Sequence, residues 1–232
     1  MNSPAQTLAL FQGECFLELE IFVEKFKSIR AFVFDWDGVF NDGKKDEKGS
    51  SPFSEIDAMG TNLLRFNYHL GARKQAVVAV ISGEHNHAAK TLATREHFHA
   101  VYSGIKHKAQ ALEHLCATQN LEEHEVAFVF DDVLDFSLAA RCGLRIMVQR
   151  DCNPLLIQWA VRAGYVDYLT GAAGENHAVR EAVELMMGLS GIYDETIQNR
   201  ATFSPRYQQY LEERNQTETQ FFSVKNSEIV AQ

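Results

Sequence analysis

The sequence predicts an α/β fold with a mostly parallel sheet sandwiched by helices. Three continuous apolar runs, at residues 31–34, 76–81 and 126–130, have the length of strands that are buried on both faces. Helix-like patterns separate these runs, and such alternation is typical of an open parallel sheet. The chain has 232 residues, of which 46% are hydrophobic, so one domain can bury a sizeable core.

The elements before the second strand follow from spacing and from turn residues. Apolar residues recur at helical spacing over residues 8–27, which predicts an amphipathic helix. The first strand, at 31–34, comes next. Residues 39–53 then hold Gly43, Gly49, Pro52 and a charged cluster, which favours a protruding hairpin or loop.

The remaining elements alternate between helical patterns and apolar runs of strand length. The expected helices are 58–70 (ended by Gly71), 84–96, 106–117, a helix up to 141, 155–163 and 178–187. The expected strands are 76–81, 99–102, 126–130, 145–148 and 166–169.

We expect three parts along the chain. Residues 1–28 form the N-terminal helix, residues 29–189 form the core with its hairpin at about 40–55, and residues 190–232 form a polar C-terminal extension. In this extension Tyr207, Tyr210 and Leu211 predict a short docking helix, and Phe221 and Phe222 predict a small apolar anchor. The rest of the extension is expected to be mobile.

Charge and cysteine content narrow the functional classes. The 31 acidic and 22 basic residues give a formal net charge of -9, which disfavours nucleic acid and anionic membranes as partners. The four cysteines form no CxxC pair, so reduced thiols are expected. No apolar window of about 20 residues and no signal-peptide pattern is found, which favours a soluble cytoplasmic protein.

Paired carboxylates mark the end of the first strand. Asp35 and Asp37 follow it directly, and Gly38 lets the backbone turn sharply. Two buried carboxylates side by side are costly unless a cation neutralises them. The pair therefore predicts a divalent-metal or acid/base site, and the alternative is a strand end followed by a solvated, aspartate-rich turn.

Other polar groups follow the neighbouring strands, at the edge where ligands of parallel sheets bind. Ser82 ends the second apolar run, and Asp131, Asp132 and Asp135 follow the third. These groups suit phosphoryl transfer, since the serine can bind a phosphoryl oxygen and the carboxylates suit Mg²⁺. A lysine after the next strand would neutralise the phosphoryl charge, and Lys106 and Lys108 both qualify by position.

In this scheme the first two carboxylates divide the reaction between them. Asp35 would attack as a nucleophile and form an aspartyl-phosphate. Asp37 would protonate the leaving oxygen and later activate water. The order DxD, Ser, Lys, DDxxD, each after a strand, is the specific part of the pattern.

The segments FDWDGVFNDG, FSEIDAMGTNLL, AVISGE, VYSGIKHK, VFDDVLDFS and GENHAVRE carry a resemblance to a known family. Over about residues 29–187 the chain resembles the haloacid-dehalogenase-like phosphohydrolases. Within them it is similar to the small branch without a large cap domain. That branch includes the 3-deoxy-D-manno-octulosonate 8-phosphate phosphatases and the phosphatase-like domain of acylneuraminate cytidylyltransferases. The resemblance implies a Rossmann-like fold and a phosphatase, a hydrolase of phosphoric monoesters.

The resemblance also assigns roles residue by residue. It implies Asp35 as nucleophile and Asp37 as general acid/base, with Mg²⁺ held by Asp35, Asp131 and the backbone carbonyl of Asp37. The implied phosphate-binding residues are Ser82, Gly83, Asn41 and Lys108, the last in preference to Lys106. The implied supporting acidic residues are Asp132 and Asp135.

A further implication concerns assembly. Residues 42–54 match a β-hairpin that helps to build a homotetramer, in which a neighbouring subunit covers the site. Four places differ from the family pattern: Asn41 replaces threonine, Phe130 replaces glycine, Glu84 replaces arginine, and Glu175-Asn176-His177 replace a turn with glycine and arginine. Phe130 is expected to crowd the metal loop, and Glu84 to repel an anionic sugar acid.

The expected function is Mg²⁺-dependent hydrolysis of a small phosphorylated metabolite, such as a sugar-acid phosphate. The alternative is a catalytically weakened protein of the same fold with a structural or regulatory role in an oligomer. A phosphoacceptor receiver domain is disfavoured, because its lysine comes last and its chain is shorter.

Overall fold

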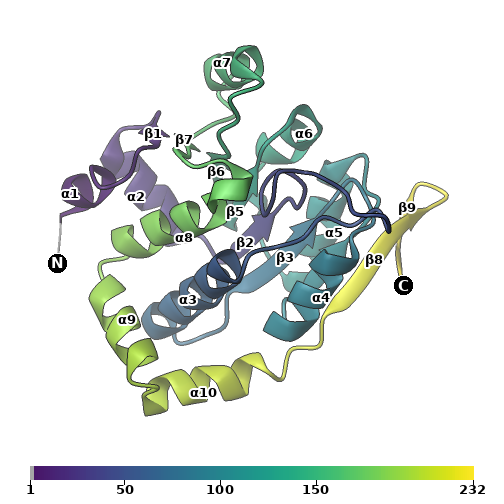
Figure 1. Cartoon of the computed structure of the whole chain (residues 1–232). Helices are drawn as coiled ribbons and strands as arrows, with labels where there is room; N and C mark the ends of the chain where they lie inside the picture. The colour runs from purple at the N-terminus through teal and green to yellow at the C-terminus, as the bar shows by residue number, and fades with distance from the viewer. Residues whose placement is uncertain (1–2) are drawn as a thin grey trace.

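The computed structural model describes residues 3–232, and its centre is a mixed sheet with helices on both faces (Figure 1). Residues 1 and 2 of the expected N-terminal unit lie outside this range. The described residues form nine strands in the order β1-β7-β6-β5-β2-β3-β4-β8-β9. The strands are β1 (Glu14–Cys15), β2 (Ala31–Phe34), β3 (Val77–Ile81), β4 (Ala100–Tyr102), β5 (Val126–Phe130), β6 (Leu144–Met147), β7 (Tyr168–Leu169), β8 (Gln220–Lys225) and β9 (Glu228–Ala231).

Helices connect and cover these strands. They are α1 (Pro4–Leu8), α2 (Leu19–Ser28), α3 (Glu55–Ala72), α4 (His87–Glu96), α5 (Lys108–Gln119), α6 (Phe136–Ala139), α7 (Pro154–Arg162), α8 (Ala178–Leu189), α9 (Tyr193–Ala201) and α10 (Pro205–Arg214). Three 3₁₀ turns accompany them, η1 (Glu123–Glu125), η2 (Val133–Asp135) and η3 (Gly174–Asn176).

The three central strands are parallel and in register. Phe34 of β2 lies opposite Val80 of β3 and Val129 of β5. Residues that follow these strands therefore emerge at one edge of the sheet, as the sequence predicts.

Alternate side chains of the strands enter two separate cores. Phe32 and Phe34 pack with α2, α3, α4 and α8, whereas Ala31 and Val33 pack with α5, α6 and α7. Both faces of the sheet are thus covered by apolar contacts, which explains why the central strands are apolar throughout. The predicted α/β sandwich is confirmed, and the described residues contain no large cap domain.

The single helix predicted for residues 8–27 is wrong. The chain instead forms α1 and α2 with β1 between them, and β1 pairs antiparallel with β7. Gly13 explains the break, because a Cβ atom there would lie 2.1 Å from the Tyr168 hydroxyl oxygen. The helical spacing of apolar residues comes from two short elements that face the same core.

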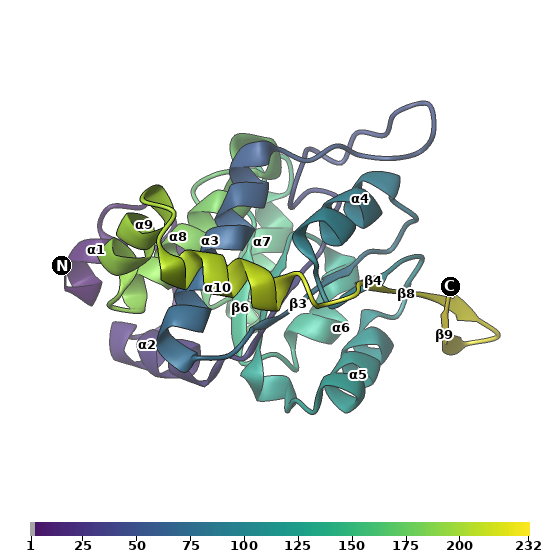
Figure 2. The ribbon, with the colours of Figure 1, turned by 90° about the horizontal axis from the view of Figure 1, so that it is seen from below.

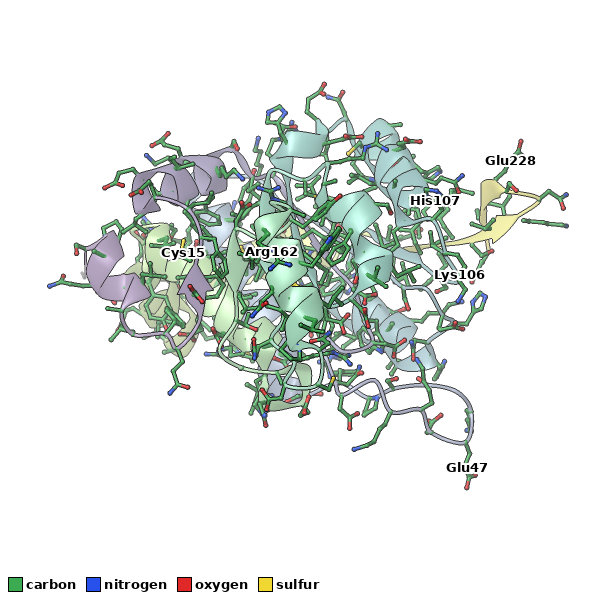
Figure 3. All side chains as sticks on the ribbon, turned by 90° about the horizontal axis from the view of Figure 1, so that it is seen from above. Cys15, Glu47, Lys106, His107, Arg162 and Glu228 are labelled. Carbon is green, nitrogen blue, oxygen red and sulfur yellow. The ribbon has the colours of Figure 1, made fainter. Side chains whose placement is uncertain are left out.

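Residues 40–54 form a loop that contains no strand, so the predicted β-hairpin is wrong in detail. The loop folds back where the Asp46 carbonyl accepts from Gly49 N–H (2.9 Å) and the Asp46 N–H donates to the Ser50 carbonyl (2.8 Å). It projects from the body of the protein on the same side as the β8–β9 hairpin (Figure 2). Figure 3 shows Glu47 at the far end of the loop and Glu228 on that hairpin.

The C-terminal extension is an integral part of the fold, so its expected mobility is wrong. Helices α9 and α10 pack along α3, and Tyr207 and Tyr210 contact the Phe66 ring at centroid distances of 5.0 and 5.2 Å. This confirms the predicted docking helix. Strand β8 pairs parallel with β4, with Phe221 opposite Val101, and β9 follows it antiparallel.

The other element boundaries agree with the sequence pattern to within a few residues. One difference is the end of α3, which passes Gly71 and stops at Arg73 in the left-handed conformation (φ 56°). Within residues 3–232, no helix has the length and apolar character needed to cross a membrane.

Candidate active site

Three buried carboxylates meet at the carboxyl edge of the central strands. Asp35 follows β2, Asp131 follows β5, and Asp135 lies at the end of η2. One oxygen of each lies within 4.8 Å of the others, and the three residues are at most 6% exposed. The cluster brings together groups that are about 100 positions apart in the sequence.

A buried lysine neutralises part of this charge. Lys108, at the start of α5, is 1% exposed and donates from Nζ to Asp35 Oδ1 (2.6 Å) and to Asp135 Oδ1. Lys106 instead forms a surface ion pair with Glu84 (2.5 Å). The structure therefore brings Lys108 to the carboxylates, and leaves Lys106 outside.

Burial and mutual repulsion shift the acidities in the cluster. Burial and the Asp135 carboxylate raise the pKa of Asp35 to about 6, although Lys108 opposes the rise. Burial, together with Asp35 and Asp135, raises the pKa of Asp131 well above its usual range. Burial disfavours the charged form of Lys108, but the two carboxylates outweigh it and raise its pKa, so this lysine stays a cation.

The donor set suits a hard divalent cation. Three carboxylate oxygens at mutual ligand spacing form a site whose charge a dication would balance, and the pKa values of Asp35 and Asp131 are raised. Asp135 joins Asp35 and Asp131 in the carboxylate cluster, and the Asp37 carboxylate lies outside it. The expected metal set of Asp35, Asp131 and the backbone carbonyl of Asp37 stays a prediction. Asp132 also lies apart, as an exposed N-cap that accepts from Val133 N–H (2.6 Å).

The Asp37 carboxylate is held by three groups of its own. It pairs with Lys45 (2.5 Å), and it accepts from Ser51 Oγ (2.6 Å) and from Asn86 Nδ2 (2.9 Å). Its side chain is 24% exposed, so it lies at the mouth of the site and not with the buried cluster. Lys45 belongs to the charged run that the sequence suggests is a solvated loop tip, but its side chain turns back to the site.

The Ser82-Gly83 segment lies at the end of β3, beside the strand that carries Asp35. Ser82 is buried at the end of β3, and its Oγ accepts from Glu84 N–H (3.2 Å), which leaves the hydroxyl hydrogen for another acceptor. A Cβ atom on Gly83 would lie 2.8 Å from Leu134 Cδ2. Glycine here therefore allows the close approach of η2, which carries Asp135.

Asn41 has a different role from the expected one. Its Oδ1 accepts from Gly38 N–H (3.3 Å) and Gly43 N–H (2.8 Å), and its Nδ2 donates to the Trp36 and Pro52 carbonyls (3.3 and 2.9 Å). These bonds join the two ends of the protruding loop. Because both ends of the amide are engaged by backbone, the expected bond from Asn41 to phosphate is not supported.

Phe130, expected to crowd the metal loop, points into the core. It is 0% exposed and stacks on Phe128 (5.3 Å between centroids), with Phe136 edge-on at 6.2 Å. Glu84 carries Lys106 as a counter-ion, and this pair lowers the pKa of Glu84. The altered family positions therefore leave the carboxylate cluster intact.

The fourth family difference, at Glu175-Asn176-His177, lies in a turn that packs beside Gly38 of the DWDG segment. His177 Nδ1 lies 3.3 Å from Asp57 Oδ2, and a Cβ atom on Gly174 would lie 2.4 Å from the Gly38 carbonyl oxygen. The turn at 174–177 thus packs directly against the first motif.

Sequence reasoning missed two cations. Arg150 Nη2 lies 2.6 Å from Asp131 Oδ2, and Lys45 pairs with Asp37 as described above. The available signal for Arg150 is its place three residues after β6, at the same edge of the sheet. Lys45 carries no such signal, because its position depends on how the loop folds back.

Comparisons with known proteins agree with the fold and the motifs. No protein-family model matches the chain. The chain is 29% identical over 182 residues to 3-deoxy-D-manno-octulosonate 8-phosphate phosphatase of Escherichia coli K12, covering 75% of this chain and 87% of that one. It is 28% identical over 171 residues to the phosphatase of the same name from Yersinia pestis, with coverage of 71% and 83%.

Solved structures of similar proteins have the same fold. One is the phosphatase of that name from Moraxella catarrhalis, which was solved with a magnesium ion, a phosphate ion and KDO. It has a TM-score of 0.64 and 28% sequence identity, and the match covers 80% of this chain and 98% of that one. That from Yersinia pestis has a TM-score of 0.62 and 25% identity, with coverage of 75% and 89%. In its sheet, its ordered motifs and these relatives, the chain is similar to the haloacid-dehalogenase-like phosphatases of the branch without a large cap domain.

Proposed function

We propose that this protein is a Mg²⁺-dependent phosphomonoesterase that acts on a small phosphorylated metabolite. The observation that carries the proposal is the buried cluster of Asp35, Asp131 and Asp135 around Lys108. A solvated turn would not bury three carboxylates together, because the desolvation cost is large without a cation or a catalytic use.

Asp35 is the proposed nucleophile. Lys108 Nζ, 2.6 Å from its Oδ1, favours the ionised carboxylate and fixes its orientation. A carboxylate oxygen attacks phosphorus and forms an aspartyl-phosphate as the ester P–O bond breaks. A bound Mg²⁺ would supply neutralisation of the phosphoryl charge, and Lys108 and Ser82 add positive and hydrogen-bonding groups beside it.

Asp37 is the proposed general acid and base. In the first step its carboxyl proton passes to the leaving alkoxide oxygen, and in the second it accepts a proton from the water that attacks the aspartyl-phosphate. Ser51 and Asn86 hold its two oxygens apart from the metal cluster. Lys45 pairs with this carboxylate (2.5 Å) and helps to fix its position.

A sugar-acid phosphate is the proposed substrate class. The relatives' names specify 3-deoxy-D-manno-octulosonate 8-phosphate, and the chain spans most of their length. Glu84 is the group expected to repel the carboxylate of such a substrate, and its pairing with Lys106 reduces that repulsion. The weakened-protein alternative rested on Phe130 and the altered rim, and the buried position of Phe130 removes its main support.

The test is phosphate release from a panel of sugar-acid and sugar phosphates, with MgCl₂ and with a chelator. We expect Mg²⁺-dependent turnover that Asp35→Asn lowers at least about 10³-fold, since the nucleophile is lost. Lys27→Ala is the matched control and should retain turnover, because this lysine of α2 is 64% exposed and pairs with Glu24 on the same helix. Turnover that persists in Asp35→Asn, or that is absent for every substrate with Mg²⁺ present, would contradict the proposal.

We also propose that the protein assembles as a homotetramer whose subunits cover the open site. Exposed apolar side chains offer contact surface for such an assembly: Ile56 (46%) and Met59 (38%) at the start of α3, and Val133 (63%) and Leu134 (39%) in η2. Light scattering after size exclusion should give about four times the 26.2 kDa chain mass, and a monomer at micromolar concentration would contradict this.

A further inference from the structure

Arg150 lies against the carboxylate cluster, and the proposed mechanism gives it no role. It belongs to the connection between β6 and α7 (Figure 1), and its Nη2 lies 2.6 Å from Asp131 Oδ2. A Cβ atom on Gly38 would lie 1.7 Å from this Nη2 and 2.1 Å from the Asp131 oxygen. The guanidinium therefore rests directly on the glycine of the DWDG turn, beside the candidate metal site.

The two cations of the cluster are held very differently. Lys108 is 1% exposed and bonded to two carboxylates, so it is fixed in the interior. The Arg150 side chain is 25% exposed and forms an ion pair with Asp131. Its guanidinium also faces the base of the protruding loop, since a Cβ atom on Gly43 would lie 3.8 Å from Nη2. Arg150 is thus the cation that can change partners at the mouth of the site.

A divalent cation and Arg150 would compete for the same carboxylate. Asp131 belongs to the triad whose oxygens lie within 4.8 Å of one another, and its Oδ2 already accepts from Arg150. A carboxylate that ligates a dication has less charge left for a guanidinium. A guanidinium that loses its carboxylate can bind a phosphate or a second carboxylate in bidentate fashion.

We propose that Arg150 pairs with Asp131 in the metal-free protein and turns to the anionic group of the substrate once Mg²⁺ binds. This inference rests on the proposed phosphatase function and adds a substrate-binding residue to it. Metal loading would then prepare the substrate site, because the metal releases the cation that holds the substrate anion. A purely structural Arg150 would have no such link.

The proposal predicts that loss of the Arg150 guanidinium changes the affinity for Mg²⁺ and the affinity for substrate in opposite directions. Removing the guanidinium leaves the triad more negative, so Mg²⁺ should bind more tightly. The substrate anion loses a partner, so its binding should weaken. If the ion pair were only structural, its loss would weaken the binding of both Mg²⁺ and substrate, or of neither.

Arg150→Gln tests this directly. By titration calorimetry of the metal-free protein with MgCl₂, we expect the Mg²⁺ Kd to fall about threefold to tenfold. With p-nitrophenyl phosphate at saturating Mg²⁺, we expect KM to rise about tenfold and kcat to change by less than about threefold. Arg150→Lys keeps the charge without the planar fork, and it should give the wild-type Mg²⁺ Kd with an intermediate KM.

Lys27→Gln is the matched control, because it removes one positive charge from a lysine of α2 that is 64% exposed and pairs with Glu24. It should change neither the Mg²⁺ Kd nor KM appreciably. An Arg150→Gln protein with weaker or unchanged Mg²⁺ binding, or with an unchanged KM, would overturn the proposal. If the wild-type protein hydrolyses no ester, the phosphatase function fails, and calorimetric titration with inorganic phosphate, with and without Mg²⁺, still decides the role of Arg150. If Arg150→Gln does not fold, the Arg150→Lys variant decides it.

Discussion

Lys108 is the single charged side chain on which the geometry of the carboxylate cluster depends. Its ammonium group is 1% exposed and bridges Asp35 and Asp135, so it has no route to solvent. Removing one partner of a buried ion pair leaves uncompensated charge, which costs about 3–5 kcal/mol. Lys108 therefore contributes to folding as well as to the proposed chemistry.

We expect Lys108→Ala to lower the free energy of unfolding by about 3 kcal/mol or more without metal. Added MgCl₂ should restore part of the loss, because a dication can balance the three carboxylates in place of the ammonium. Urea denaturation with and without MgCl₂ measures both effects, and Lys106→Ala serves as the exposed control. Equal stability of wild type and Lys108→Ala would contradict this view of the cluster.

Phe130 allows a separate test of where its ring lies. Because the ring is stacked between Phe128 and Phe136, Phe130→Ala should reduce stability by about 3–5 kcal/mol through the cavity it leaves. The KM of the folded variant should stay within about twofold of wild type. Denaturation and steady-state kinetics on one preparation give both values. A lower KM or a faster turnover would indicate that the ring obstructs the site after all.

At the scale of elements, the β3–β4 pair contains a histidine that is held neutral. Val78 N–H donates to His99 Nδ1 (3.2 Å), so this nitrogen must be unprotonated in the fold. Burial, with a smaller effect of Arg65, lowers the pKa of His99 to about 4. The unfolded chain has the ordinary value of about 6.5 and so binds the proton more tightly.

This difference predicts a pH dependence of stability. Between about pH 6.5 and pH 4 the unfolded state carries more protons at this position, so stability should fall as the pH falls through this window. The contribution approaches about 3 kcal/mol at and below pH 4. His99→Asn keeps an acceptor for Val78 N–H but does not titrate. The unfolding free energy of the variant should therefore fall less than that of wild type as the pH is lowered from 7 to 4. A difference that is constant from pH 7 to pH 4 would show that His99 is not responsible.

The C-terminal hairpin is the element that closes one side of the sheet. Phe222 of β8 stacks on Tyr102 at 4.9 Å and meets the His114 ring at 4.7 Å, so it covers apolar surface of β4 and α5. An unpaired strand edge with apolar neighbours promotes association between chains.

Truncation after residue 217 should therefore lower the melting temperature and promote aggregation. Phe222→Ala should show a smaller loss in the same direction, since the backbone pairing with β4 remains. Thermal unfolding with light scattering detects both. If the truncated chain were as stable and monodisperse as the full chain, the hairpin would not contribute to the stability of the sheet edge.

On the scale of the whole molecule, metal binding should couple to stability. The protein has a formal net charge of -9, and the carboxylate cluster adds local repulsion in its interior. A ligand that binds only the folded state stabilises it by about 2.7 kcal/mol at 100 times its Kd. For a domain of this size, that corresponds to a rise in melting temperature of about 5–10 °C.

Thermal melts over a series of MgCl₂ concentrations should show this rise in the wild-type protein. Asp131→Asn should lose most of it, because one ligand of the triad loses its charge. An equal rise with NaCl at matched ionic strength would indicate screening of the net charge and not a specific site.

Much of this architecture was predictable because it depends on local patterns. Strands β2 and β5 begin and end where the apolar runs do, since strands covered on both faces admit no polar residue. The convergence of Asp35, Ser82 and Asp131 was predictable too, because parallel strands in register end at one edge. Even the choice of Lys108 followed from the family pattern and its place at the start of α5.

Other features depended on contacts that no local pattern records. The place of Asp135 in the carboxylate cluster depends on how η2 folds back, with Gly83 making room for Leu134. The role of Asn41 depends on two backbone segments that meet only after the loop closes. The C-terminal strands were missed because they are short and lie in a largely polar extension. Pairing of β8 with β4, and of β9 with β8, stabilises them in the fold.

The sequence by itself determined the α/β layers, the order of the motifs and the edge at which they meet, because burial periodicity and parallel register act over short distances. Only the tertiary structure decided which charges share the interior. The cost of burying a carboxylate is offset by partners that come from distant segments, such as Arg150 from the loop after β6, which pairs with Asp131. Such pairings arise from packing in three dimensions, and the spacing of residues along the chain does not encode them.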